Sequence, residues 1–477
     1  MTRDLTVSRR AVIAGLGASV AVAGLPARIN AARLDGWRSI TAKPAEIFML
    51  DPTRDNRRTA IWGYDGVVPG PLLRYRQGDT VRVRLKNDLP QPTSTHWHGI
   101  AIDNRMDGAV GLTQDAVPVG GSFDYAFTVP HAGTYWYHTH NRSWEQMARG
   151  LYGVLIVDEP DPPAVDRDLL FVIDDWRINR DGQIDAASFG DFRDWAHAGR
   201  LGNWLTVNGA DRPEIPVTAG ERIRLRCVNP ANARVFRLDL SPHTATLIAL
   251  DGYPLSAPTP VTEPLWLAPG QRADLIVDMD RDPKSRVAVR EISTGESYDC
   301  AFFAYGVEDR RDTRETRGDI ALTPRPTPSG FDPSTGERVE LRMTGGAMGM
   351  MGRAMHRGRM MDMRSLVGEG RMWAFNGIAG DLDKPLASIP LGRTVLVDMI
   401  NDTRWEHAMH LHGHHVRVVH RNGADIAAAP WRDTVLMQPM ERTTIAFLAD
   451  NPGKWLFHCH MLEHQAGGMK TWIEVRA

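Results

Sequence analysis

Alternating apolar and polar residues recur at three places along the chain. The clearest stretches are Gly78 to Leu89, Gly220 to Ala231 and Gly392 to Thr403, and each runs from a glycine to a turn that contains an asparagine. A period of two is typical of a β-strand with one buried side and one side in water. The three stretches therefore predict the same strand in three homologous domains.

A second repeat links the two ends of the chain. The stretch Ala132 to His140 aligns position by position with Pro452 to His460. Short strands separated by Pro and Gly turns, with few helical periods, are typical of β-sandwiches. We therefore expect an all-β protein in which helices, for instance between Asp185 and His197, are minor.

Composition shifts place the domain boundaries. Linkers are expected near Glu159 to Val165 and in the polar, Pro-rich stretch from about Arg310 to Arg338. This divides the chain into a leading segment and three domains, at residues 1–36, 37–160, 161–320 and 321–477.

The leading segment has the pattern of a targeting signal. Arg9 and Arg10 precede an apolar, small-residue run from Ala11 to Leu25, and this resembles a twin-arginine signal. We expect export by the twin-arginine (Tat) machinery and a periplasmic location, with an ordinary Sec signal or a short membrane anchor as the alternative. Beyond residue 36 no apolar run is long enough to span a bilayer, so no integral membrane segment is expected in the mature chain.

Charge and cysteine content narrow the class of partner. The 477 residues include 56 Lys and Arg against 58 Asp and Glu, a formal charge of -2, which offers no electrostatic case for binding nucleic acid. We expect the protein to bind a small molecule or an ion instead. We also expect it to be a monomer. Three cysteines allow at most one disulfide, and the sequence leaves open whether Cys227 and Cys300 pair.

Histidines follow the repeat. His96 and His98 lie as far after Gly78 as His410 and His412 lie after Gly392, whereas the middle copy has Leu238 and Leu240 there. A second set of His-x-His pairs falls on the later repeat, at His138/His140 and His458/His460. Residues i and i+2 of a strand share a face, so each pair can aim at one cavity. Eight imidazoles are too many for one ion and predict a metal cluster between domains 1 and 3.

A thiolate distinguishes the third domain from the first. Cys459 stands where domain 1 has Thr139, and His464 and Met469 follow it. With His407 these residues offer two imidazoles, one thiolate and a thioether, the composition of a blue-copper electron-transfer site. Since Cys459 is covalently joined to His458 and His460, an electron accepted at the sulfur has a short route to the cluster, where dioxygen would be reduced.

These motifs together resemble the multicopper oxidase family. The resemblance rests on His96-Trp-His-Gly99, His138-Thr-His140, the run from His407 to His414 and the run from His458 to Met469. It implies three consecutive cupredoxin-like Greek-key β-sandwich domains and four copper ions. The implied ligands are His96 and His410 for type 2 copper, His407, Cys459, His464 and Met469 for type 1, and for the type 3 pair His98, His138, His140, His412, His458 and His460.

Proton supply is expected from Asp107, which matches an acidic residue that the family places near the trinuclear group; an ordinary Asp-Gly turn is the alternative. The chain departs from similar bacterial enzymes at Gln465, where these often carry Glu. An amide cannot relay protons as a carboxylate can.

A methionine-rich stretch favours one reductant. Between Met343 and Met363 lie eight of the 20 methionines, and thioethers select Cu(I). The stretch is similar to the insert of copper efflux oxidases, so we expect Cu(I) as substrate, bound by Met348, Met350, Met351, Met355, Met360 and Met361. Asp433 is expected to border the type 1 site and to help bind the incoming Cu(I), with a surface turn as the alternative. A laccase that oxidises small organic reductants is the alternative, and a copper-free structural or division-related protein of this fold is a third reading.

Overall fold

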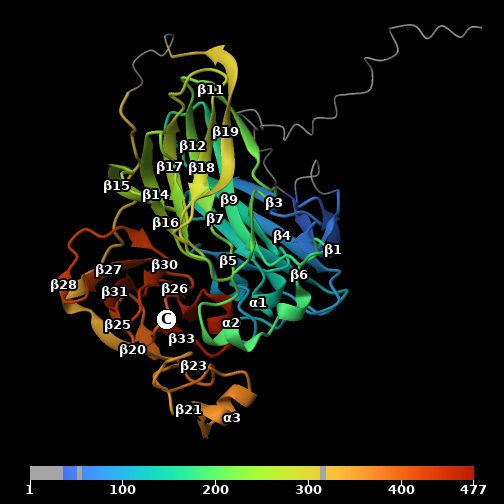
Figure 1. Ribbon diagram of the computed structural model, residues 1–477. Helices are drawn as coiled ribbons and strands as arrows, with labels where there is room; N and C mark the ends of the chain where they lie inside the picture. Colours follow the sequence, from blue (N-terminus) through green and yellow to red (C-terminus); the bar gives the residue numbers. More distant parts are fainter. Residues whose placement is uncertain (1–35, 51–55, 312–317) are drawn as a thin grey trace, which may run out of the picture.

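The computed structural model describes residues 36–50, 56–311 and 318–477, and it consists mainly of β-strands arranged as three sandwiches (Figure 1). The predicted signal segment, with Arg9 and Arg10, lies outside the described residues apart from Gly36. Among the described residues, no helix combines the length and the apolarity needed to cross a membrane.

Domain 1 is built from two four-stranded sheets. Its strands are β1 (Arg38–Ile47), β2 (Thr59–Tyr64), β3 (Gly70–Arg76), β4 (Thr80–Asn87), β5 (His96–His98), β6 (Ser122–Thr128), β7 (Gly133–His138) and β8 (Tyr152–Asp158). One sheet has the order β2-β1-β4-β6 and the other the order β3-β8-β7-β5. The second sheet carries both His-x-His stretches of this domain.

Domain 2 has a six-stranded and a five-stranded sheet. Its strands are β9 (Arg167–Trp176), β10 (Trp204–Val207), β11 (Glu214–Ala219), β12 (Arg222–Val228), β13 (Phe236–Asp239), β14 (Ala245–Leu250), β15 (Tyr253–Pro260), β16 (Leu265–Leu267), β17 (Arg272–Asp278), β18 (Arg286–Glu291) and β19 (Tyr298–Asp309). The sheet orders are β10-β9-β12-β17-β14-β15 and β11-β19-β18-β13-β16.

Domain 3 has two larger sheets and a separate hairpin. Its strands are β20 (Glu337–Gly345), β21 (Arg353–His356), β22 (Arg359–Asp362), β23 (Trp373–Phe375), β24 (Ala387–Pro390), β25 (Thr394–Asn401), β26 (His407–Leu411), β27 (Val416–Arg421), β28 (Ala424–Asp425), β29 (Trp431–Arg432), β30 (Thr434–Met437), β31 (Arg442–Leu448), β32 (Gly453–Cys459) and β33 (Lys470–Arg476). The sheet orders are β23-β20-β25-β31-β27-β28, with β29 on β27, and β24-β33-β32-β26-β30. β21 and β22 form a hairpin that projects from the sandwich beside α3 (Met363–Gly368) in Figure 1.

The three domains share one topology. The strands predicted from the repeat are β4, β12 and β25, and each pairs in parallel with the first strand of its sheet and antiparallel with a later one. The second sheets also match, because β3, β11 and β24 each pair in parallel with the last strand of the domain. The predicted all-β chain of three sandwiches is therefore confirmed.

Helices are short, as expected. They are α1 (Ser143–Gln146), α2 (Phe192–Ala196), α3 and α4 (Leu462–Ala466), with 3₁₀ turns at Asn104–Met106, Ala186–Ser188 and Pro333–Thr335. Cys227 and Cys300 are buried free thiols in the core of domain 2 and do not form a disulfide.

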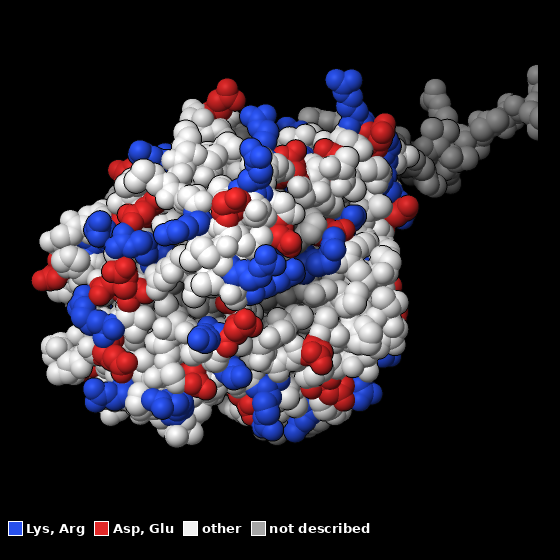
Figure 2. Space-filling view, turned by 90° about the horizontal axis from the view of Figure 1, so that it is seen from below, with Lys and Arg blue, Asp and Glu red and all other residues white. Residues whose placement is uncertain are grey.

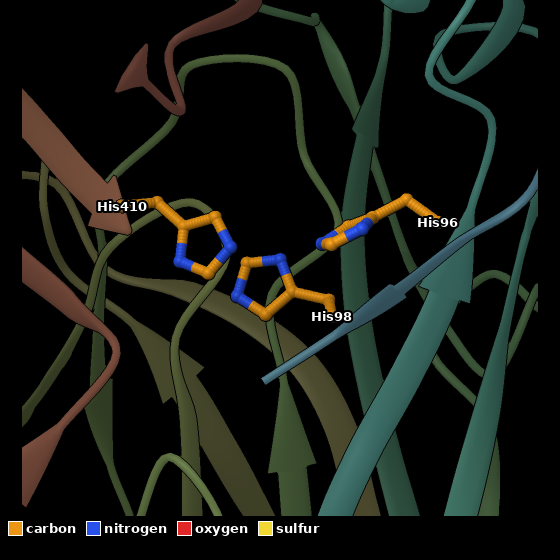
Figure 3. A group of neighbouring side chains, drawn as sticks. All are labelled: His96, His98 and His410. Carbon is orange, nitrogen blue, oxygen red and sulfur yellow. The ribbon is translucent and has the colours of Figure 1, made fainter. Parts of the chain in front are cut away.

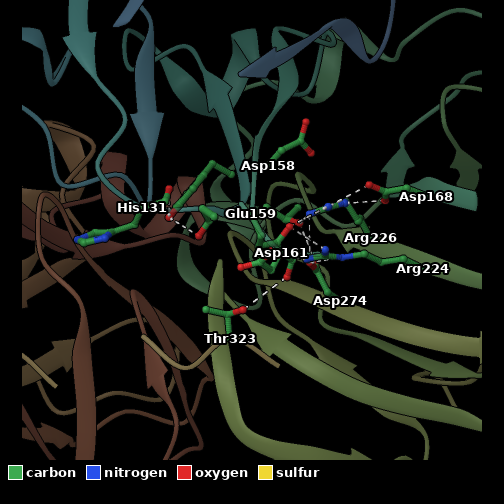
Figure 4. Close-up of polar contacts among 12 residues, drawn as sticks. His131, Asp158, Glu159, Asp161, Asp168, Arg224, Arg226, Asp274 and Thr323 are labelled. Carbon is green, nitrogen blue, oxygen red and sulfur yellow. Dashed lines mark hydrogen bonds and ion pairs between the residues drawn. The ribbon is translucent and has the colours of Figure 1, made fainter. Parts of the chain in front are cut away.

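The domains pack against each other through apolar and charged contacts. One buried cluster joins Trp136 and Tyr152 of domain 1 to Val172 and Val228 of domain 2. Beside it lies a buried ion network in which Arg226 binds Asp168, Asp274 and the Thr134 hydroxyl (Figure 4). On the surface, basic and acidic side chains are interspersed over the face shown in Figure 2.

Candidate metal centre

The structure brings all eight histidines of the predicted cluster to one place. In domain 1 the pair on β5 lies beside β7, with His96 opposite His138. In domain 3 the pair that begins on β26 lies beside β32, with His410 opposite His458. His140, His412 and His460 follow directly after the ends of their strands. All eight rings therefore face the junction between the outer two domains.

Rings from the two domains are in direct contact. Figure 3 shows His96 and His98 from domain 1 turned toward His410 from domain 3. The rings of His98 and His410 stack with centroids 3.7 Å apart and planes inclined by 10°, and those of His96 and His412 stack at 3.8 Å. The histidine rings of domains 1 and 3 are thus brought together where one domain docks on the other.

The ring nitrogens fall into groups that fit metal ions. Within each group, donor atoms lie within 4.8 Å of one another, and three groups consist of cluster histidines alone, namely His96/His98/His410, His98/His138/His460 and His140/His412/His458. Each group includes residues from both domains 1 and 3. A cluster of three ions can therefore form only when these domains are assembled.

Outer hydrogen bonds orient the rings. One nitrogen of each of six rings donates to a protein oxygen: His96 to the Asp107 carbonyl, His98 to the Asp433 carboxylate, His138 to the Thr139 carbonyl, His410 to the Asp433 carbonyl, His412 to the Asp107 carboxylate and His458 to the Cys459 carbonyl. The other nitrogen is thereby left as an acceptor. This is the arrangement by which outer partners set the tautomer of a metal-binding histidine.

The inner nitrogens lack donors, which is the observation that tests the fit of a metal. Among the described residues, His96 Nε2, His98 Nδ1, His138 Nε2 and His410 Nε2 are buried with no hydrogen-bond partner. His412 Nε2 and His458 Nε2 face each other at 3.1 Å although both are acceptors. Unpaired buried acceptors cost free energy, and cations placed between them would satisfy them.

Burial also holds these imidazoles in the neutral form that binds metals. Desolvation, followed by the neighbouring imidazoles, lowers the pKa of six of the rings well below the usual value, namely His98, His138, His140, His412, His458 and His460. The pKa of His410 is lowered for the same reason, with Asp433 opposing the shift. These seven imidazoles thus present free lone pairs at neutral pH.

A second group lies around Cys459. His407 Nδ1 is 3.6 Å and His464 Nδ1 is 3.8 Å from the Cys459 Sγ, and the two nitrogens are 3.1 Å apart. The outer nitrogen of His407 donates to the Thr403 hydroxyl at 2.8 Å, and that of His464 donates to the His197 carbonyl at 2.6 Å. Both inner nitrogens and the sulfur therefore converge on one point.

The thiol needs a cation to ionise there. Burial raises the pKa of Cys459 to about 12, so at neutral pH its thiolate forms only when a metal compensates the charge. Met469 is buried, and its backbone carbonyl accepts from the Cys459 amide at 3.0 Å. Two imidazoles, one thiolate and a nearby thioether suit copper.

Asp107 lies against the cluster. Its carboxylate accepts from His412 Nδ1 at 2.9 Å and its carbonyl accepts from His96 Nδ1 at 2.7 Å. It is buried rather than part of a solvent-facing turn. A carboxylate in this position contacts ligands from two domains.

Asp433 is not where the sequence placed it. It lies between β29 and β30, fully buried, and binds His98 and Arg272. It therefore belongs neither to a surface turn nor to the surroundings of the Cys459 group. The prediction was wrong because Arg272, from a distant part of the chain, draws the carboxylate inward.

The methionine-rich segment contributes to the core of domain 3 and forms a hairpin. Met343 is a core residue of β20, and Met351 packs against Ala354 and Leu366 in a small separate core. Met348, Met350 and Met360 are 74%, 96% and 56% exposed, whereas Met355 and Met361 are half-buried. Met355 and Met360 are cross-strand partners in the hairpin.

Sequence reasoning missed the residues that orient the ligands through hydrogen bonds, either directly or through a hydrogen-bonding partner of the ligand. Thr403, His197 and Arg272 each contact a ligand or its partner. Thr403 sits at the end of the repeated strand, which is a weak signal for it. Nothing in the spacing points to the other two, because they belong to the domain for which no copper ligand was predicted.

Comparison with known proteins agrees with this geometry. Multicopper oxidase family models match residues 49–162, 167–298 and 352–477. The multicopper oxidase MmcO of Mycobacterium tuberculosis is 31% identical over 95% of this chain and 91% of its own. A copper resistance protein A homolog of Pseudomonas syringae is 26% identical over 98% of this chain and 99% of its own. The crystal structure of a multi-copper oxidase from Pseudomonas thermotolerans superposes with a TM-score of 0.79 at 30% identity, over 92% of this chain and 99% of the other.

The chain belongs to the multicopper oxidase family. Its three domains are cupredoxin-like, and membership implies a copper-dependent oxidoreductase. The resemblance stated from the four copper motifs is confirmed.

Proposed function

We propose that this protein couples the one-electron oxidation of Cu(I) to the reduction of dioxygen to water, in the periplasm, as a defence against copper. The observation that carries the proposal is the position of Cys459. Its peptide neighbours His458 and His460 belong to two different ligand groups of the cluster. The thiolate site is thus bonded through the backbone to both groups at once.

The ligand assignment is the one that the family resemblance implies, and the donor groups support it. Type 1 copper would be held by His407, Cys459, His464 and Met469, and type 2 copper by His96 and His410. The type 3 pair would be held by His98, His138 and His460 on one side and by His140, His412 and His458 on the other. Copper bound in this way supplies one-electron transfer at the thiolate and four-electron reduction of dioxygen at the cluster.

The chain's own residues orient the ligands and hold protons. Asp107 keeps a carboxylate on His412 Nδ1, at the edge of the cluster. It is the residue proposed to deliver protons there. The His197 carbonyl holds His464 at the boundary between domains 2 and 3.

The methionine segment begins beside this boundary, which supports Cu(I) as the substrate. The Ala347 amide donates to the Ala196 carbonyl, and the Ala347 carbonyl accepts from Trp405 Nε1 at 3.0 Å. The ring of Trp405 contacts that of His197, whose carbonyl binds His464. Exposed Met348 is therefore linked, through its neighbour Ala347 and the contacts just described, to the type 1 ligand His464.

The test replaces exposed thioethers without disturbing the core. A variant with Met348→Leu, Met350→Leu and Met360→Leu keeps apolar side chains but cannot ligate Cu(I), and Met440→Leu, also 55% exposed, is the matched control. We expect the triple variant to raise KM for Cu(I) by about 10-fold or more, since ligand removal weakens metal binding, while oxidation of a phenol is unchanged. An unchanged KM for Cu(I) would favour the laccase alternative. Protein that takes up no copper and shows no intense visible charge-transfer band would exclude both.

A further inference from the structure

The central domain supplies one wall of the cluster although it holds no predicted ligand. At Gly270, where φ is +86°, a Cβ atom would lie 3.0 Å from the His460 ring and 3.1 Å from His98 Cε1. The neighbouring Gln271 side chain donates to the Thr434 carbonyl at 2.9 Å. The segment that leads into β17 is therefore packed against rings from both outer domains.

Arg272, the first residue of β17, binds the Asp433 carboxylate through two side-chain nitrogens. Arg272 Nη2 lies 2.7 Å from Asp433 Oδ2, and Nη1 donates to Oδ1 at 2.9 Å. Arg272 Nε donates to the Thr134 carbonyl at 3.1 Å, on the strand that leads to His138. Both side chains are fully buried, so the pair is held in one orientation.

Asp433 in turn orients two of the predicted ligands through hydrogen bonds. Its Oδ1 accepts from His98 Nε2 at 3.1 Å and from the Thr434 hydroxyl at 2.8 Å, and its carbonyl accepts from His410 Nδ1. His98 is thereby left with Nδ1 facing the cluster. The chain of contacts runs from domain 2 through domain 3 to domain 1.

Asp251 fixes the other side of the arginine. Its Oδ1 accepts from the Arg272 amide at 2.9 Å, and its Oδ2 lies within hydrogen-bond distance of the Asp433 and Thr434 amides, at 3.3 and 3.4 Å. This carboxylate is also fully buried. The turn that carries Asp433 and the strand that carries Arg272 are therefore tied together by backbone as well as side-chain contacts.

We propose that Arg272 is a positioning residue for the trinuclear site, which it serves by holding the Asp433 carboxylate against His98 and so completing from domain 2 a site whose ligands lie in domains 1 and 3. This inference rests on the proposed copper sites. Among the described residues, the Cys459 group forms no hydrogen bond or ion pair with the triad of Asp251, Arg272 and Asp433, so its spectrum serves as an internal control.

The experiment compares Arg272→Met and Arg272→Lys with Arg226→Met. Arg226 is equally buried, binds acidic residues (Figure 4) and contacts Thr134, but among the described residues it forms no hydrogen bond or ion pair with a cluster histidine. Copper-free proteins are loaded with Cu²⁺ and challenged with a chelator, and copper per chain and the thiolate charge-transfer band are recorded. Thermal unfolding of the copper-free proteins reports stability separately.

We expect Arg272→Met to weaken binding of the trinuclear copper by about 10- to 100-fold, the usual effect of losing an outer partner, with the thiolate band kept. Arg272→Lys, which retains the charge but not the two-pronged contact, should fall between this variant and wild type. Arg226→Met should lose thermal stability but keep wild-type copper binding.

Wild-type copper binding in both Arg272 variants would overturn the proposal, as would equal copper loss in Arg272→Met and Arg226→Met. If Arg272→Met does not fold, a folded Arg272→Lys that binds copper as the wild type does would overturn it alone. A wild-type protein that binds no copper would instead refute the proposed function.

Discussion

Replacing Gly99 by alanine would drive a methyl group into a buried ion pair. Gly99 follows His98 and has φ of +86°. A Cβ atom at this position would lie 2.3 Å from Arg272 Nη2 and 2.5 Å from Asp433 Oδ2. Neither group can move away easily, because both are fully buried and each has further partners.

The cost has two parts that can be separated. An L-residue in the left-handed region costs about 1–2 kcal/mol. Overpacking of a tight interior adds about 1–3 kcal/mol, and separating the ion pair would raise the total further, since a broken buried pair costs about 3–5 kcal/mol. Gly78 has φ of +87° with no heavy atom within 4 Å of its Cβ position, so Gly78→Ala carries only the first part.

Urea unfolding of copper-free protein, followed by tryptophan fluorescence, measures both variants. We expect Gly99→Ala to lower the free energy of unfolding by at least about 1–3 kcal/mol more than Gly78→Ala does. Equal losses in the two variants would refute the packing of Gly99 against the Arg272–Asp433 pair. Copper uptake should fall in Gly99→Ala and stay normal in Gly78→Ala.

Two further predictions concern single acidic residues. Asp107→Asn should keep its copper but slow the reoxidation of reduced enzyme by dioxygen by about 10²- to 10⁴-fold, as expected for loss of a proton donor; stopped-flow rates equal to wild type would contradict this role. Burial, and next the charge of Asp175, raises the pKa of Asp174 to about 8, against 3.8 for the ordinary group. The folded state therefore keeps a proton that the unfolded chain releases, and this adds to the free energy of unfolding. The added free energy is complete below pH of about 4 and falls by about 1.4 kcal/mol per pH unit as the pH rises to about 8. Asp174→Asn should abolish that part of the decline in urea-unfolding experiments at pH 5 and pH 8, and parallel profiles for wild type and variant would contradict it.

The repeated parts of the protein were predictable and the unique contacts were not. The strand repeat anticipated β4, β12 and β25 to within three residues at each end, because the period of two reflects burial that is local to each strand. The same repeat placed the histidine pairs, whose i, i+2 spacing is itself a strand property.

Asp433 shows where such reasoning fails. A single acidic residue before a short strand has the same local pattern whether it faces water or an arginine. Its partners Asp251 and Arg272 lie in another domain, and no periodicity relates the three positions. The methionine segment was predicted only as a set of thioethers, and its hairpin, which is followed by α3, was not anticipated.

The donors of the cluster are divided between β5 and β7 in the first domain and β26 and β32 in the last. A ribosome therefore releases the first four imidazoles long before the remaining four exist. Until β32 has been synthesised, the four histidines of the first domain lack their partner ligands from the last domain. They can therefore hold an ion only weakly. Each group of three imidazoles is therefore complete only in the full-length, folded chain, and we expect metal loading of the cluster to follow folding.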